Sequence, residues 1–167
     1  MSTLTEFYNE TGVDCDGRTL SEIWAKDDDY WEFSHNYVQW LFPLQEASNF
    51  NPDAPLLTDE DIAIFKANPL IQTNLLVSFA RYLRFFGLEY KDGEVQKMED
   101  FQALLFMHPN HNWFRITRAL KSLRLLGLET ETVAFYNFLK KLHEETGWVN
   151  EHSFSFWKEA VNGLVEV

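Results

Sequence analysis

The residue types that could do chemistry in this chain gather between Phe101 and Leu128. This segment contains no aspartate or glutamate, although the whole chain carries 26 acidic residues against 14 lysines and arginines. Its basic residues recur every third position: Arg115, Arg118, Lys121 and Arg124. Arginine binds carboxylate and phosphate through two parallel hydrogen bonds, and the free N–H groups at a helix N-terminus also favour an anion. The segment predicts a carboxylate or phosphate pocket, with structural ion pairs to acids on neighbouring helices as the alternative.

Polar side chains beside these cations extend the predicted pocket. His111 and Asn112 lie at the mouth of a helix that we expect to begin near Asn112. His108 and His111 could be zinc ligands, but a zinc site needs three or four ligands and this turn contains no cysteine. Asn112 is better suited to capping the helix than to binding a metal. We therefore expect no metal and no cofactor, and assign four residues to a candidate ligand site: His111, Asn112, Arg115 and Arg118.

A second polar group lies upstream, beside an irregular stretch. Residues 43–57 contain three prolines and two asparagines, which prevent a regular element, and an irregular segment of this length inside a domain is often functional. The helix predicted before it turns His35 and Gln39 away from its apolar face. These two residues form either a solvated polar face or a wall that faces a ligand, and both interpretations stay open. Together with Asn51 and Asp53 of the loop, they complete the candidate site.

The single cysteine, Cys15, does not have the surroundings of a reactive nucleophile. Asp14 and Asp16 flank it, and adjacent negative charge disfavours the thiolate. One cysteine excludes an intramolecular disulfide, which suits a reducing compartment. We find neither a signal peptide nor an apolar stretch of the roughly 20 residues that a membrane span needs. The sequence therefore predicts a soluble, cytoplasmic protein with no transmembrane segment.

The net charge and the absence of common catalytic motifs argue against several classes of function. A formal net charge of −12 opposes binding to nucleic acid, so we do not expect nucleic acid as a partner. The chain has no glycine-rich phosphate loop and no Gly-x-Ser-x-Gly motif. The leading hypothesis is a non-enzymatic domain that binds an unidentified peptide, protein or anionic small molecule. The alternative is an enzyme that acts on an anionic small molecule at the same histidine and arginine pocket.

Hydrophobic periodicity and capping signals predict an all-α fold of about seven to eight helices. Capping-box patterns start helices at Thr19 and Thr58, and Pro69 opens a long helix whose missing N–H costs nothing. Glycines just after apolar repeats end the helices: Gly87, Gly127 and Gly147. The helical elements require a core, and a hydrophobic fraction of 46% supplies one without a metal or disulfide.

The predicted elements form one compact domain with a long proline-containing loop. We expect a loosely ordered lead-in over residues 1–18 and the domain itself over residues 19–167. One predicted helix runs from about Asp29 to Phe42 and another from about Val95 to Met107. No alternation of apolar and polar residues is long enough to predict a strand.

Four blocks of unusual composition follow one another along the chain. They are HNYVQWLFPL at 35–44, NPDAPLLT at 51–58, NHNWFRITR at 110–118 and LKSLRLLGL at 120–128. Together they resemble the opioid growth factor receptor conserved-region family, from about residue 20 to the end of the chain. The resemblance implies opioid peptide (Met-enkephalin) binding and receptor activity, with no established enzymatic activity and therefore no catalytic residues to carry over. Because the chain ends soon after the conserved region, we expect a compact stand-alone member.

Overall fold

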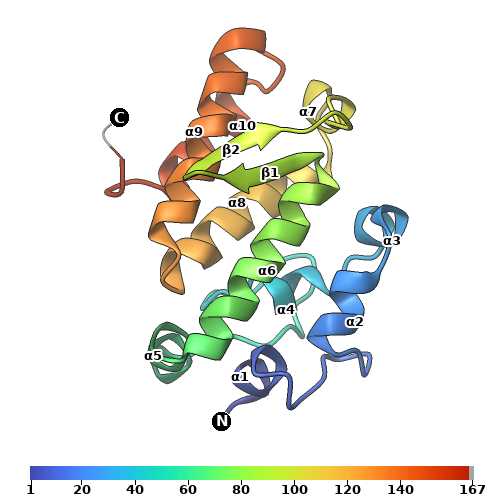
Figure 1. Cartoon of the computed structure of the whole chain (residues 1–167), viewed down its shortest axis with the longest axis vertical. Helices are drawn as coiled ribbons and strands as arrows, with labels where there is room; N and C mark the ends of the chain where they lie inside the picture. Colours follow the sequence, from blue (N-terminus) through green and yellow to red (C-terminus); the bar gives the residue numbers. More distant parts are fainter. Residues whose placement is uncertain (166–167) are drawn as a thin grey trace. The chain divides into compact units, whose positions relative to one another are not determined.

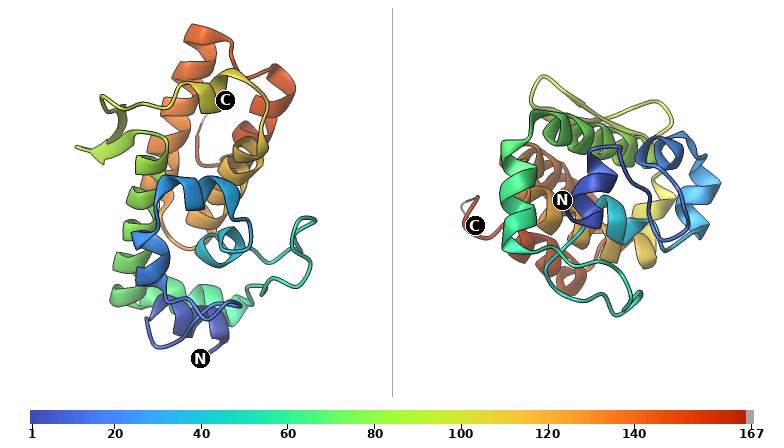
Figure 2. Two further views of the ribbon diagram at one scale, coloured as in Figure 1. Left: turned by 90° about the vertical axis from the view of Figure 1, so that its right-hand side faces the viewer. Right: turned by 90° about the horizontal axis from the view of Figure 1, so that it is seen from below.

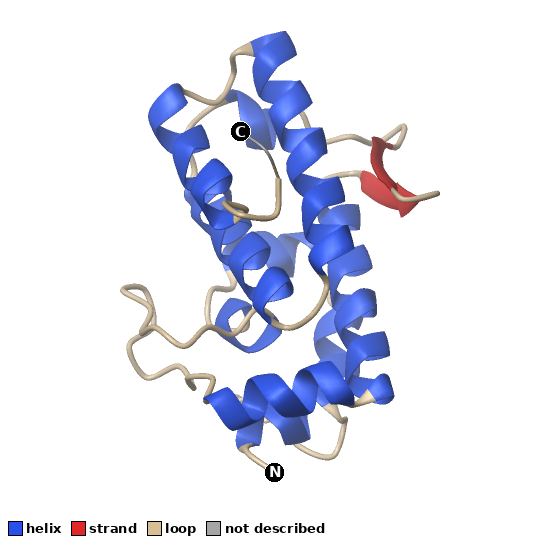
Figure 3. Ribbon diagram, turned by 90° about the vertical axis from the view of Figure 1, so that its left-hand side faces the viewer, coloured by secondary structure: helices blue, strands red, loops and turns tan. Residues whose placement is uncertain are grey.

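Helices dominate the structure, so the all-α prediction is confirmed (Figure 1; Figure 3). The computed structural model describes residues 1–165, and the sheet within them is one two-stranded hairpin. The chain divides into two compact units that are described separately below: unit 1, Met1–Arg81, and unit 2, which begins at Tyr82. None of the helices within residues 1–165 has the length and apolar composition needed to cross a membrane.

Unit 1 consists of short helices and most of one long helix. Its elements are α1 (Thr3–Tyr8), α2 (Leu20–Ala25), α3 (Asp28–Phe33), α4 (Val38–Leu41), α5 (Asp59–Ala67) and α6 (Pro69–Phe85), whose last residues belong to unit 2. The capping box predicted at Thr58 is confirmed, since its hydroxyl accepts from the Asp61 N–H and the Asp61 carboxylate accepts from the Thr58 N–H, both at 3.0 Å. Local capping therefore fixes the start of α5.

Up to residue 165, unit 2 contains the end of α6, a hairpin and four further helices. Its elements are β1 (Leu88–Lys91), β2 (Glu94–Lys97), α7 (Leu104–Met107), α8 (His111–Leu125), α9 (Glu129–Thr146) and α10 (Glu151–Ala160). Gly147, with a φ of 66°, ends α9 in the left-handed conformation, as the sequence predicted. The core is aromatic: the Phe86 and Phe106 rings lie 5.3 Å apart, and the Trp157 indole donates to the Trp113 carbonyl. The Phe86–Phe106 contact packs α7 against the end of α6, and the Trp157–Trp113 hydrogen bond holds α10 to α8.

A buried polar stripe on α6 organises unit 1. Asn74, Ser78 and Arg81 follow the i, i+4, i+7 spacing of one helix face, and all three are buried. The Asn74 amide donates to the Tyr8 carbonyl at 2.7 Å. The Ser78 hydroxyl accepts from the Trp24 indole N–H at 2.9 Å and lies 3.0 Å from the Tyr8 hydroxyl. The stripe therefore ties α1 and α2 to α6 at fixed positions.

Arg81 extends the same stripe toward α2 and α3. Its guanidinium donates to the carbonyls of Trp24 and Lys26 and to the Asp28 carboxylate, at 2.8–3.1 Å. It also lies 4.3 Å from the centre of the Trp31 ring. A buried cation needs this degree of hydrogen bonding to offset its lost hydration. One side chain therefore satisfies the carbonyls at the end of α2 and holds α3 in place.

The helix predicted over Asp29–Phe42 is wrong, because the structure breaks it into α3 and α4. Ser34 adopts an extended conformation with a ψ of 142°. The buried Tyr37 hydroxyl donates to the Trp31 carbonyl, which a continuing helix would have used for the N–H four residues later. Phe33, which lies inside the predicted helix, is 73% exposed, so the stretch does not bury one continuous apolar face. A side-chain hydrogen bond thus replaces a turn of helix.

The helix predicted over Val95–Met107 is also wrong over its first half. Val95 belongs to β2 and pairs with Tyr90 of β1. Asp92 and Gly93 have positive φ angles of 53° and 80°, the combination that a tight two-residue hairpin turn requires. Helix α7 begins only at residue 104. Cross-strand pairing over this Asp-Gly turn overrides the helical spacing.

The loosely ordered lead-in expected over residues 1–18 does not match the structure. Ser2 caps α1, and Phe7 and Tyr8 are fully buried. Further along, the Arg18 guanidinium lies 2.6 Å from the buried Asp14 carboxylate. Hydrogen bonds link the same guanidinium to the Tyr30 hydroxyl and the Asn36 side chain. A buried ion pair and two aromatic residues therefore fix a segment whose glycines and acids suggested looseness.

The environment of Tyr8 predicts a specific loss of stability at alkaline pH. Its hydroxyl donates to the Leu41 carbonyl at 2.5 Å, and burial raises its pKa far above the ordinary value, with the Ser78 hydrogen bond opposing the shift. A raised pKa in the folded state stabilises the fold below the unfolded pKa near ~10 and loses that effect as pH rises beyond it. The free energy of unfolding should therefore fall by an extra ~1.4 kcal/mol per pH unit above that point.

Urea unfolding at a series of pH values from 8 upward measures this slope. Tyr8→Phe, which cannot ionise, should have a lower unfolding free energy than the wild type at neutral pH. That free energy should fall less steeply than the wild-type value as the pH becomes alkaline. Parallel curves for the two proteins would show that Tyr8 does not control the alkaline transition.

Candidate functional site

The eight residues predicted to bind a ligand fall into two groups of four. His35, Gln39, Asn51 and Asp53 lie in unit 1, and His111, Asn112, Arg115 and Arg118 lie on α8 in unit 2. Each group is described within its own unit.

The start of α8 is fixed by Asn110 rather than by Asn112. The Asn110 side-chain oxygen accepts from the Asn112 N–H at 2.9 Å, and its amide donates to the carbonyls of Leu105 and His108 at 2.8 and 2.7 Å. The Leu105 carbonyl also accepts from the Trp113 indole at 3.0 Å. The expected capping role of Asn112 is therefore wrong, because the preceding asparagine already satisfies the helix end and ties it to α7.

Helix α8 presents three of its candidate residues on one side. His111, Arg115 and Arg118 follow the i, i+4, i+7 spacing of one helix face. Arg115 is only 7% exposed, and His111 and Arg118 are half-buried. Asn112 is fully buried. A positively charged group this close to the N–H groups of the first helical turn is a chemically suitable environment for a carboxylate or phosphate oxygen.

Arg124, the last cation of the acid-free segment, makes a hydrogen bond to another helix of unit 2. The Arg124 guanidinium donates to the carbonyl of Ala160 at 3.1 Å. This bond joins the C-terminal turn of α8 to the end of α10, where orphan carbonyls need donors. Arg124 thus has a structural role within unit 2, although its partner is a main-chain carbonyl rather than the acid of an ion pair.

In unit 1 the structure brings two of the four candidate residues together. The Asn51 amide donates to the side-chain oxygen of Gln39 at 3.3 Å, and Gln39 is only 5% exposed. The Ser48 hydroxyl accepts from the Asn51 N–H, which shapes the loop between α4 and α5 that Figure 2 shows without helix or strand. His35 and Asp53 are exposed. Gln39 therefore anchors the proline-containing loop rather than facing solvent.

Two cavities in unit 2 were not anticipated from the sequence. One, of about 450 Å³, lies between β2 and α9, and the other, of about 490 Å³, lies between α9 and α10. None of the eight predicted residues lines either cavity. The first was missed because its strand was predicted as helix. Phe138, which lines this first cavity, is half-buried.

The second cavity contains a histidine that faces two hydrogen-bond acceptors. His143 Nδ1 lies 2.8 Å from the Val149 carbonyl, and Nε2 lies 2.8 Å from the Glu151 carboxylate. Each ring nitrogen therefore lies within hydrogen-bond distance of an oxygen atom. The ring also stacks on Phe154 with centroids 4.2 Å apart. These contacts join the end of α9 to the start of α10, so the packing of the two helices explains the position of His143.

The described residues place no metal centre. Within residues 1–165, no group of three or more His, Cys, Asp or Glu side chains is arranged to hold a metal ion. Cys15 is exposed and not in a disulfide, and burial followed by the charges of Asp14 and Asp16 raises the pKa of its thiol. A raised pKa keeps the thiol in its less reactive form.

The sequence blocks around the α4–α5 loop and α8 identify the family. Residues 1–164 match the family described as the opioid growth factor receptor (OGFr) conserved region. The chain therefore belongs to this family, and the family region covers residues of both units. No solved structure matches the chain.

Curated relatives show the same relationship. The opioid growth factor receptor-like protein 1 of Mus musculus is 36% identical over 152 residues, which cover 86% of this chain and 32% of that protein. The opioid growth factor receptor of Homo sapiens is 39% identical over 135 residues, covering 75% of this chain and 20% of that protein. The chain thus spans a third or less of the length of these relatives.

The cap of α8 supplies a test of how the candidate site is positioned. Asn110→Ala removes the acceptor for the Asn112 N–H and the donor to the carbonyls of Leu105 and His108, so it should destabilise the protein by about 1–2 kcal/mol. Asn110→Asp keeps the capping acceptor and should recover part of the loss. Urea unfolding measures both variants. Equal stability of Asn110→Ala and the wild type would mean that α8 does not depend on this cap.

Proposed function

We propose that this chain is a non-enzymatic ligand-binding or protein-binding domain, and that the first turns of α8 bind an anionic group of the partner. The group is a carboxylate or phosphate carried by a peptide, protein or small molecule. His111, Asn112, Arg115 and Arg118 would form the contact surface in unit 2. The observation that carries the proposal is the segregation of charge on this helix.

Charge segregation supports an anionic ligand because it runs against the composition of the chain. The net charge is −12, yet the segment that contains α8 has cations and no acids of its own. Arg115 is held close to the helix N-terminus, where the aligned peptide dipoles add to its positive charge. The planar arginine fork matches two oxygens of one carboxylate better than a lysine does.

In unit 1 we propose that the loop between α4 and α5 forms a second contact surface. His35 and Asp53 supply exposed polar groups, while the bond between Gln39 and Asn51 holds the loop in shape. A loop anchored at its base and exposed at its tip is a common arrangement for recognition.

The names of the relatives suggest the class of partner. These proteins are called opioid growth factor receptors and receptor-like proteins, so we propose that an opioid peptide is one occupant and that receptor activity extends to this chain. The free C-terminal carboxylate of such a peptide would bind near Arg115. An exposed free thiol at Cys15 supports a reducing, cytoplasmic location. The alternative of an enzyme at the same residues rests on the sequence alone.

Anion binding should be visible as thermal stabilisation. Sulfate or phosphate should raise the melting temperature above that in chloride at equal ionic strength, because a ligand that binds only the folded state stabilises it. Arg115→Lys should weaken this effect. Arg84→Lys, the same change at an exposed position on α6, serves as the matched control and should respond like the wild type.

The outcome separates the two roles of the arginines. If wild type and Arg115→Lys respond to sulfate no more than to chloride, the cations are structural and α8 is not the anion site. A peptide with a free C-terminus and its C-terminal amide form a second pair of probes. Equal binding of the two peptides would show that the C-terminal carboxylate is not the group that α8 binds.

A further inference from the structure

The hydrogen-bond pattern of the hairpin leaves one edge of β2 directed away from β1. The Met98 N–H donates to the Gly87 carbonyl at 2.9 Å, so these residues form a hydrogen-bonded pair. Bonded and non-bonded pairs alternate along an antiparallel ladder. The register therefore makes Leu88–Lys97 and Tyr90–Val95 non-bonded pairs. The main-chain N–H and C=O groups of Val95 and Lys97 point outward.

These outward groups have no partner from another segment. Among residues 1–165, no hydrogen bond between β2 and another part of the chain reaches the main chain of Val95 or Lys97. The side chains of Glu94 and Lys97 have no ion-pair partner within the described residues, and the Lys97 ammonium lies 4.8 Å from the centre of the Phe101 ring. An unpaired strand edge is a template for another extended chain.

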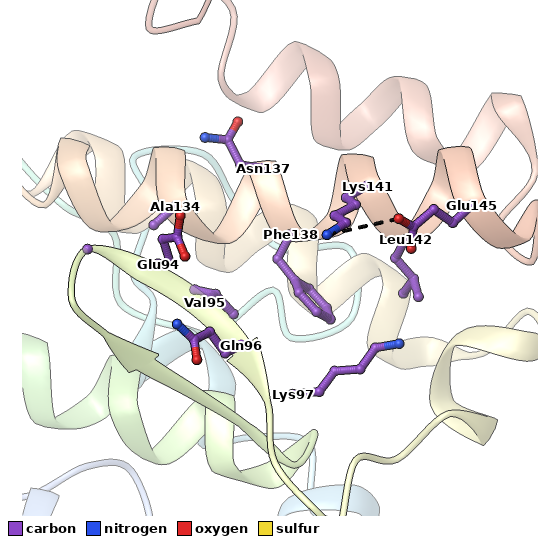
Figure 4. A pocket seen from close by; sticks show the side chains of 11 residues that line it. Glu94, Val95, Gln96, Lys97, Ala134, Asn137, Phe138, Lys141, Leu142 and Glu145 are labelled. Carbon is purple, nitrogen blue, oxygen red and sulfur yellow. Dashed lines mark ion pairs between the residues drawn. The ribbon is translucent and has the colours of Figure 1, made fainter.

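The cavity of about 450 Å³ lies along this edge. Figure 4 shows β2 running beside α9, with the Phe138 ring between them. Val95 and Ala134 add buried apolar surface, and Leu142 continues it along α9. The groove therefore has a main-chain edge on one side and a partly apolar helix surface on the other. Protein domains that bind peptides by strand addition combine these two features.

The charges along β2 favour one kind of occupant. Glu94 and Lys97 lie at opposite ends of the strand, and Lys97 lies on the same face as the buried Val95. A strand running antiparallel to β2 would meet Lys97 first, then Val95, then Glu94. Such a strand would pair well with an acidic residue opposite Lys97, an apolar residue two positions later opposite Val95, and a basic residue next, opposite Glu94.

We propose that the outer edge of β2 and the surface of α9 bind an extended segment of a partner protein by antiparallel strand addition. The segment has the pattern acidic–x–apolar–basic. A second copy of this chain fits less well, because pairing β2 with itself sets Lys97 opposite Val95 rather than opposite an acid. This surface shares no residue with the anion site proposed on α8, so either proposal can fail alone.

The probe is the capped peptide acetyl-Thr-Asp-Thr-Val-Lys-Thr-amide, added at millimolar concentration to the full chain labelled with ¹⁵N. In the free protein, the outward amides of Val95 and Lys97 should exchange with solvent faster than the inward amide of Gln96. Binding should protect the two outward amides and leave Gln96 unchanged. The charge-exchanged peptide, with Lys and Asp swapped, should bind roughly fivefold more weakly because two cross-strand pairs become repulsive.

Methylated peptides test main-chain pairing directly. N-methylation of the peptide valine blocks an N–H that points at β2 and should abolish binding. N-methylation of the central threonine, one residue away, blocks an N–H that points outward and should leave binding nearly unchanged. Equal binding of the two methylated peptides, or shifts confined to residues outside β2 and α9, would overturn the proposal.

A protein variant gives the complementary test. Lys97→Pro removes an outward N–H without breaking a bond to β1, a position where strands tolerate proline, and should abolish binding. Lys97→Gln keeps the N–H and should only weaken binding, which keeps the test valid if the proline variant fails to fold. No binding of any probe by the wild type, or a wild-type dimer in sedimentation velocity that Lys97→Gln or Lys97→Pro dissolves, would contradict a peptide partner.

Discussion

The buried polar stripe of α6 is the constraint on which unit 1 depends. Asn74, Ser78 and Arg81 satisfy a carbonyl of α1, an indole of α2 and the carbonyls at the end of α2. Short helices of this kind are marginal by themselves, because each forms few internal hydrogen bonds for the backbone it orders. Directional bonds to one long helix fix their positions, which apolar packing alone specifies less closely.

The parts of the fold that could be predicted are those determined by neighbouring residues. The capping box at Thr58, the start of α6 at Pro69 and the end of α9 at Gly147 all follow from local backbone chemistry. The hairpin and the break at Ser34 were not predicted, because helical spacing of apolar residues does not reveal a strand pairing across a turn or a side-chain bond to a helix carbonyl. Val95 pairs across the turn with Tyr90, and the Tyr37 hydroxyl donates a hydrogen bond to a carbonyl of α3.

The candidate site was predictable in its chemistry more than in its geometry. The gathering of cations on α8 is a property of composition, so the amino-acid sequence alone is enough to single out Arg115. The contact between Gln39 and Asn51 required the path of the proline-containing loop. The outer edge of β2 could not be predicted from the types of side chain, because its binding groups are main-chain atoms.

Hydrogen exchange of the Ser78→Ala variant tests the role of the α6 stripe most directly. Removing this hydroxyl deprives Trp24 of its acceptor and Tyr8 of a neighbour, which should lower the unfolding free energy by about 1–3 kcal/mol. We predict that amides of α1 and α2 lose protection together, while Thr73→Ala, at an exposed position on the same helix, leaves them unchanged. A loss of protection confined to the turn of α6 around Ser78 would contradict the account.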